Sequence, residues 1–296
     1  MRPISINDAR RVIEMADMDR GQIVPCLVGP PGIGKTQTVY QFAEDNGRRV
    51  VEMILSQRLP TEVSGLVMPD TETKSMEVFD HSRLASLRDG DILLFDELLE
   101  APPMVLSACL TLIQERRLMS GKKLPDILIV AATNPTQTPS MNKLSLRQRF
   151  MWFEVEYNKS IWMKWIKDNL NIELDLSMKL LSLISTEGSG YNVLTPRTAS
   201  KLLALGKKAF SDNSFDEFLY MVDSMFNDEV RNAFDQVFST QSPKQQIITA
   251  IGHMVGEDVQ DSFEDCSIKD MMDILNSLDN WKEISEKLSS VQMKRY

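Results

Sequence analysis

Cysteine and histidine are scarce in this chain of 296 residues. The three cysteines, odd in number and far apart, form no C-x-x-C pair, which argues against both a disulfide framework and a zinc site. This usage fits a reducing compartment, so we expect a cytoplasmic protein. The two histidines are solitary and give no reason to expect another metal site. These scarce residues are Cys26, Cys109, Cys266, His81 and His253.

Long apolar runs and an excess of basic charge are also missing. No run approaches the roughly 18 apolar residues that a membrane span requires, and the N-terminus lacks the apolar segment of a secretory signal. The chain has 33 Lys and Arg against 42 Asp and Glu, a net charge of −9 at pH 7. This balance argues against nucleic acid as a partner, although it leaves room for a local basic groove.

One stretch carries a strong chemical signal. Residues 29–36 read Gly-Pro-Pro-Gly-Ile-Gly-Lys-Thr and fit the phosphate-binding loop pattern G-x-x-x-x-G-K-[ST] at every fixed position. An apolar run at 23–28 precedes it and helical spacing at 39–43 follows it, which is the strand–loop–helix setting that the motif requires. Lys35 would contact the β- and γ-phosphates of ATP, and Thr36 would offer its hydroxyl to Mg²⁺. We assign ATP binding to Gly29, Pro30, Pro31, Gly32, Ile33, Gly34, Lys35, Thr36 and Gln37.

Two acidic residues follow a second apolar run. Residues 92–95 are continuously apolar, as expected of a strand covered on both faces, and Asp96 and Glu97 come directly after them. Parallel sheets bind ligands at the carboxyl ends of their strands. We therefore assign Asp96 to hold Mg²⁺ and Glu97 to deprotonate the attacking water. The alternative is an acidic cap for the helix that begins near Pro102.

Strand and helix patterns alternate over the first half of the chain. This alternation predicts an α/β fold with a doubly wound parallel sheet around the phosphate-binding loop. We also expect a hairpin over 66–79, turning at 69–71, and a loop over 59–65. The predicted strands of the sheet lie at 23–28, 49–55, 92–95, 127–132 and 152–155.

From about Tyr157 the pattern is helical throughout. We therefore expect an α/β nucleotide-binding domain over 1–156, a helical lid over 157–240 and a helical C-terminal extension over 241–296. The helical segments are predicted to begin near residues 160, 176, 196, 215, 229, 243, 268 and 281.

Taken in order, these motifs resemble those of AAA+ ATPases, and within that class the chain is similar to the MoxR family. The loop at 29–36 matches Walker A, and Phe-Asp-Glu at 95–97 matches Walker B. The string Asp-Glu-x-x-x-Ala-Pro-Pro at 96–103 resembles MoxR proteins in particular, as do Gln-Glu-Arg at 114–116 and Leu-Pro followed by Gly within 59–65. The resemblance covers about residues 5 to 210.

One departure from the MoxR pattern follows Walker B. MoxR proteins usually carry an Asn and a basic residue soon after the Walker B glutamate, whereas Leu98, Leu99 and Glu100 stand here. The contacts that those polar residues make in the family are therefore not carried over to this chain.

The resemblance also assigns roles to two polar residues outside the Walker motifs. Asn134, in Ala-Thr-Asn-Pro at 132–135, matches the sensor-one residue; the alternative is a turn before Pro135. Arg197, in Thr-Pro-Arg-Thr at 195–198, matches sensor two at the start of a lid helix. A surface charge is the alternative there, although the first turn of a helix is an unfavourable place for a cation.

An arginine finger is implied by Leu-Arg-Gln-Arg-Phe at 146–150. The Arg-Phe pairing favours Arg149, and Arg147 is the alternative. A finger acts on the nucleotide of the adjacent subunit, so the resemblance implies self-association into a ring, with a hexamer expected.

The resemblance implies a chaperone-type ATPase that remodels a protein partner. MoxR relatives often work with a partner that carries a von Willebrand factor A domain, and the resemblance implies the same type of partner here. Two other functions stay open: a nucleic-acid motor or subunit of a DNA-processing complex, which the acidic charge opposes, and a non-hydrolysing scaffold or switch, which intact Lys35, Asp96 and Glu97 oppose. Threading unfoldases usually carry an aromatic residue in the loop after the second strand. Residues 56–65 contain none, which favours remodelling by conformational change.

Overall fold

A computed structural model describes residues 2–19, 22–135, 144–172, 178–186, 193–212 and 214–239. Two compact units are distinguished, one comprising Met1–Asn169 with Ile184–Ser200 and the other beginning with Leu170–Leu183 and continuing from Lys201. The predicted extension over 241–296, with Cys266 and His253, lies outside the described residues.

The first unit is built on a five-stranded sheet in the order β2-β5-β6-β1-β7. Every neighbouring pair of strands is parallel, so the connections cross over through helices. This confirms the predicted α/β class with a parallel sheet. The strands are β1 (Pro25–Val28), β2 (Val50–Ile54), β5 (Ile92–Asp96), β6 (Leu128–Thr133) and β7 (Met151–Glu154).

Helices cover both faces of this sheet, and β5 shows how one strand serves both. Leu93 and Phe95 belong to the apolar cluster that includes α5 (Pro103–Glu115). Ile92 and Leu94 belong to the opposite cluster, which includes α1 (Ile6–Met18) and α2 (Lys35–Asp45). Successive side chains of a strand point to opposite faces, so a strand buried on both sides has to be apolar at every position.

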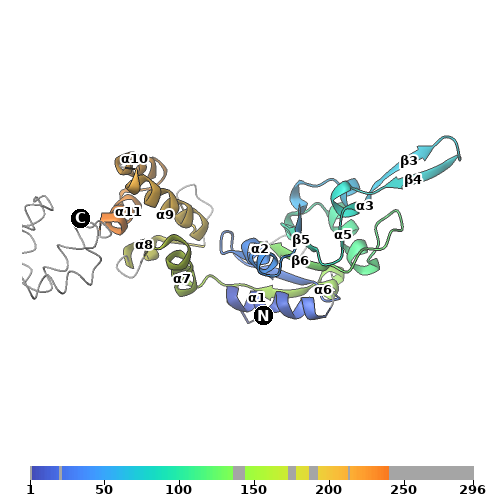
Figure 1. Cartoon of the computed structure of the whole chain (residues 1–296), viewed down its shortest axis with the longest axis horizontal. Helices are drawn as coiled ribbons and strands as arrows, with labels where there is room; N and C mark the ends of the chain where they lie inside the picture. Colours follow the sequence, from blue (N-terminus) through green and yellow to red (C-terminus); the bar gives the residue numbers. More distant parts are fainter. Residues whose placement is uncertain are drawn as a thin grey trace, which may run out of the picture. The chain divides into compact units, whose positions relative to one another are not determined.

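A β-hairpin extends away from the sheet (Figure 1). Its antiparallel strands are β3 (Leu66–Asp70) and β4 (Ser75–Phe79). The hairpin was predicted, but the predicted turn at 69–71 is wrong, because β3 continues to Asp70 and the turn occupies 71–74. The carboxylate of Asp70 stabilises this later turn by accepting hydrogen bonds from the backbone N–H groups of Glu72 (2.9 Å) and Thr73 (3.3 Å).

The loop predicted over 59–65 is also wrong, since most of it forms the short helix α3 (Pro60–Ser64). Pro60 occupies the first turn, where its missing N–H costs no hydrogen bond. The Glu62 carboxylate accepts a hydrogen bond from the backbone N–H of Leu59 at 2.8 Å and so closes the start of the helix. Five residues are too few to show helical periodicity, which explains the miss.

Further helices complete the first unit. Three of them, η1 (Leu55–Gln57), η2 (Leu98–Glu100) and α6 (Leu144–Arg149), carry polar residues of the candidate site. Among the described residues after β7, secondary structure is helical in both units apart from one isolated bridge at Val155, as predicted. No helix in the described ranges has the length and apolarity to cross a bilayer. The remaining elements of the first unit are α4 (Ser82–Ala85) and α7 (Lys159–Leu170).

The second unit is a helical bundle with an aromatic core. Its helices are α8 (Met178–Leu183), most of α9 (Pro196–Ser211), α10 (Phe215–Met225) and α11 (Asp228–Ser239). Phe218 packs edge-on against both Phe234 and Phe238, with ring centroids 5.9 and 6.0 Å apart. Gly206 lets α9 approach these rings, because a Cβ there would lie 2.6 Å from a ring carbon of Phe238.

Candidate nucleotide site

The loop between β1 and α2 requires glycine at three positions. A Cβ at Gly29 would lie 2.4 Å from the carbonyl oxygen of Val155. Gly32 and Gly34 have φ angles of +80° and +103°, which L side chains rarely adopt. The glycines therefore allow the backbone conformation that a phosphate-binding loop requires. This conformation fits the nucleotide site predicted for the loop.

Lys35 begins α2 and is buried beneath this loop. Its ammonium donates hydrogen bonds to the carbonyl oxygens of Gly29 (2.6 Å) and Pro30 (2.8 Å) and to Oδ1 of Asn134 (3.1 Å). Only 7% of the residue is exposed. The side chain is thus held between the loop and the end of β6, where its charge would act on phosphates in the loop.

Burial has a measurable consequence for Lys35. Desolvation lowers the pKa of the ammonium to about 8, and the charge of Arg197 adds to the effect. The carboxylates of Asp96 and Glu100 oppose the shift because they favour the charged form. The ammonium is therefore charged at neutral pH but titrates close to it.

Thr36 and Asp96 form the second element of the site. The Thr36 hydroxyl, on α2, donates a hydrogen bond of 2.8 Å to Oδ2 of Asp96, at the end of β5. Mg²⁺ prefers oxygen ligands of this kind, a hydroxyl and a carboxylate, with the remaining positions taken by water and phosphate. The donor set therefore fits the predicted Mg²⁺ site, and the ion would neutralise charge on the transferring phosphate.

Glu97 follows Asp96 with a left-handed backbone, at φ 55° and ψ 42°. Its carboxylate accepts a hydrogen bond from the hydroxyl of Ser56 in η1. Ser56 was not predicted as a site residue. The contact depends on β2 lying beside β5, and the order of strands in a sheet is not written in any local pattern of the sequence.

Asn134 comes directly after β6 and lies beside Lys35, as its predicted role requires. The other end of its amide, Nδ2, donates a hydrogen bond of 3.2 Å to Oε1 of Glu100. Glu100 is the second site residue that sequence reasoning missed. The only signal was its departure from the MoxR pattern, which marked the position but suggested no partner.

Arg197 is exposed at the second position of α9 and lies against the loop. Its Cβ would be 2.9 Å from a Cβ placed at Gly32. Its charge lowers the pKa of Lys35, in addition to the larger effect of burial. The structure therefore brings Arg197 next to the loop, and its sensor-two role stays a prediction.

Arg149 ends α6, and its Nε donates a hydrogen bond of 3.0 Å to Oε1 of Gln114 on α5. Gln114 belongs to the MoxR-like segment at 114–116. Arg147, the alternative finger, has its side chain outside the described part of the structure.

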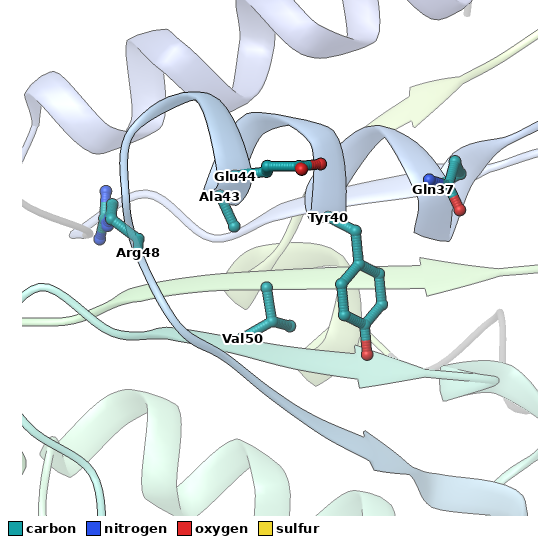
Figure 2. A pocket seen from close by; sticks show the side chains of 6 residues that line it. All are labelled: Gln37, Tyr40, Ala43, Glu44, Arg48 and Val50. Atoms are coloured by element: carbon teal, nitrogen blue, oxygen red, sulfur yellow. The ribbon is translucent and has the colours of Figure 1, made fainter. Parts of the chain in front are cut away.

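A groove of about 550 Å³ is lined by α2 and by the beginning of β2 (Figure 2). Of the predicted site residues it includes Gln37, at the N-terminal end of α2. It contains neither the Walker carboxylates nor Lys35, so these candidate catalytic residues lie outside the groove. The lining residues are Gln37, Tyr40, Ala43, Glu44, Arg48 and Val50.

Comparison with known proteins agrees with the fold. Residues 25–150 match the family model of the AAA domain, dynein-related subfamily. A mutant of RuvB from Thermotoga maritima is similar in structure, with 17% identity and a TM-score of 0.50 over 86% of this chain and 80% of that one. Another mutant of the same protein gives 18% identity and a TM-score of 0.49, over 86% and 81%. At such identities the likeness is one of fold.

Proposed function

We propose that this chain, which carries an AAA domain of the AAA+ class, is a Mg²⁺-dependent ATPase. One observation carries the proposal: the ends of β1, β5 and β6 bring Lys35, the Thr36–Asp96 pair and Glu97 to one edge of the sheet. A phosphate-binding cation, a metal-binding pair and a candidate base are the groups that hydrolysis of ATP requires.

Each group has a separate task in this proposal. Lys35 and the loop bind the phosphates, and Thr36 and Asp96 hold Mg²⁺. Glu97 accepts the proton of the attacking water, while Asn134 and Arg197 contact the phosphate end of the nucleotide. These roles rest on the positions of the residues and on their match to the family motifs.

We further propose that the active form is a ring, with a hexamer expected. The support is the finger motif, since Arg149 belongs to a segment that in related ATPases acts on a neighbouring subunit. The ring would combine the nucleotide-binding domain over 1–156 with the lid over 157–240, and the role of 241–296 stays open.

The proposed work of the ring is MoxR-like remodelling of a protein partner, with a von Willebrand factor A domain as the expected partner type. Residues 56–65 form η1 and α3 without any aromatic residue, which supports remodelling by conformational change over threading. A cytoplasmic location is part of the same proposal.

Phosphate release tests the proposal. The purified chain with ATP and Mg²⁺ should release phosphate, and removal of Mg²⁺ with a chelator should stop it. Lys35→Ala should be inactive because it loses the phosphate-binding cation, whereas Lys164→Ala, which changes an exposed lysine on α7, should match the wild type. ATP binding without hydrolysis in the wild type would favour the scaffold or switch instead.

A nucleic-acid binding measurement tests the other alternative, a nucleic-acid motor. With a net charge of −9, we expect no strong binding to duplex or single-stranded DNA at physiological salt. A sub-micromolar, steeply salt-dependent complex that stimulates hydrolysis would support a nucleic-acid motor.

A further inference from the structure

Glu100 is exposed, yet both oxygens of its carboxylate have partners at the end of β6. Oε1 accepts a hydrogen bond from Nδ2 of Asn134 at 3.2 Å, and Oε2 accepts one from the hydroxyl of Thr133 at 3.3 Å. An exposed glutamate usually points into water. Here it connects η2, which follows Walker B, to the end of β6, which carries the sensor-one candidate.

The backbone that carries Glu100 is anchored at the same place. The N–H of Leu99 donates a hydrogen bond of 3.1 Å to the hydroxyl of Thr133. Leu98 and Leu99 are buried, and Thr133 is only 1% exposed. The carboxylate of Glu100 is thus presented to Asn134 from a packed support, in contrast to a side chain on a free loop.

A carboxylate decides which way the neighbouring amide points, because it accepts hydrogen bonds and cannot donate them. With Nδ2 of Asn134 directed at Glu100, Oδ1 is the atom 3.1 Å from the ammonium of Lys35. In the reversed orientation the amide oxygen would face a carboxylate and the amide nitrogen would face an ammonium, and both contacts would be unfavourable. Glu100 and Lys35 together therefore select a single orientation of the amide.

We infer that Glu100 is a positioning residue that orients Asn134 for ATP hydrolysis. This inference rests on the proposed ATPase function. Glu100 acts through Asn134, whereas the loop and Lys35 bind the phosphates. Loss of Glu100 should therefore slow the hydrolytic step and leave nucleotide affinity little changed. Small misalignments of a catalytic group can cost about 10²-fold in rate, so a fall of about 10- to 100-fold is expected.

A double-mutant cycle tests whether Glu100 acts through Asn134. Single-turnover hydrolysis and the Kd for a non-hydrolysable ATP analogue are measured for the wild type, Glu100→Ala, Asn134→Ala and the double variant. If Glu100 works by orienting Asn134, adding Glu100→Ala to Asn134→Ala should change the rate by no more than about twofold. Fully additive losses, or an equal loss of affinity, would overturn the inference, because they would indicate an independent or purely structural role.

Two further variants distinguish a loss of Asn134 orientation from a general loss of folding. Glu100→Gln keeps the length and one carbonyl oxygen that can accept from Asn134, so it should recover most of the rate lost in Glu100→Ala. Glu44→Ala removes another exposed glutamate, on α2, and should behave as the wild type. Thermal unfolding checks all variants. If Glu100→Ala does not fold, the cycle is run with Glu100→Asp, which withdraws the carboxylate by one methylene.

The outcomes distinguish this inference from the function on which it rests. A wild type that binds ATP but does not hydrolyse it overturns the proposed function and the inference together. A hydrolysing wild type with an equally active, folded Glu100→Ala variant overturns the inference alone.

Discussion

The hydroxyl of Ser56 donates a hydrogen bond to the carboxylate of Glu97. The two residues meet because β2 and β5 are neighbours in the sheet, with Ile54 paired to Asp96. The hydroxyl holds Oε2 in its present orientation, and turning that oxygen towards an attacking water costs the energy of this bond, although the other oxygen keeps its acceptor positions. In this arrangement Ser56 restrains the candidate base.

Ser56→Ala should therefore raise basal hydrolysis. A typical hydrogen bond contributes about 0.5–1.5 kcal/mol net, which corresponds to a rise of roughly 2- to 10-fold. ATP affinity should not change, since the Ser56 hydroxyl donates its hydrogen bond to Glu97 and not to the loop. Ser107→Ala, on the exposed side of α5, is the control. A slower variant would mean that Ser56 orients Glu97 for catalysis.

Nucleotide affinity should depend on pH through Lys35. In the free protein the ammonium loses its proton as the pH rises through its pKa of about 8, and bound phosphate favours the charged form. Binding above this pH therefore requires uptake of a proton. Affinity should be flat below about pH 8 and fall above it by up to about tenfold per pH unit. Titration calorimetry from pH 7 to about pH 9.5 measures this, and a flat profile in the wild type would contradict it.

Alanine substitutions at Gly32 and Gly47 test the contact between Gly32 and Arg197, with Gly47 as the control. Both have positive φ, +80° and +61°, so alanine is strained at either position. A Cβ at Gly32 would also lie 2.9 Å from Cβ of Arg197, whereas a Cβ at Gly47 would meet nothing within 4 Å. Gly47→Ala should cost about 1–2 kcal/mol of unfolding free energy and spare ATP binding. Gly32→Ala should in addition weaken ATP binding, and equal affinities in the two variants would contradict the placement of Arg197.

The sequence and the structure agree best where a motif is local. The glycines of the loop, Lys35 and the apolar run before Asp96 are each explained by neighbours in the chain, and their predicted structure is confirmed. The partners that were missed, Ser56 for Glu97 and Glu100 for Asn134, follow the ends of different strands, Ser56 in η1 after β2 and Glu100 in η2 after β5. Their contacts depend on the order β2-β5-β6, which arises from packing of the whole sheet and leaves no local pattern.

Arg149 should act on the nucleotide of the adjacent subunit. Fingers supplied in trans contribute roughly 10³–10⁵ in rate, so Arg149→Ala alone should bind ATP and be nearly inactive. Lys35→Ala alone should also be inactive, but it keeps its finger. Mixed rings should regain single-turnover hydrolysis wherever an intact loop meets an intact finger. If Arg149→Ala by itself turns over at the wild-type rate, the finger lies elsewhere, and Arg147 is the next candidate.

The central claim is that Glu97 is the base of an ATP-hydrolysing site, and Glu97→Gln tests it most directly. The amide keeps the shape of the side chain but cannot take up the proton from water, and general bases contribute about 10²–10⁴ in rate. The decisive measurement is single-turnover hydrolysis of Mg²⁺-bound ATP by Glu97→Gln beside the wild type, with ATP affinity measured on the same samples. Glu97→Gln should bind ATP as the wild type does and lose at least about 100-fold in hydrolysis. Hydrolysis by Glu97→Gln at the wild-type rate would contradict it.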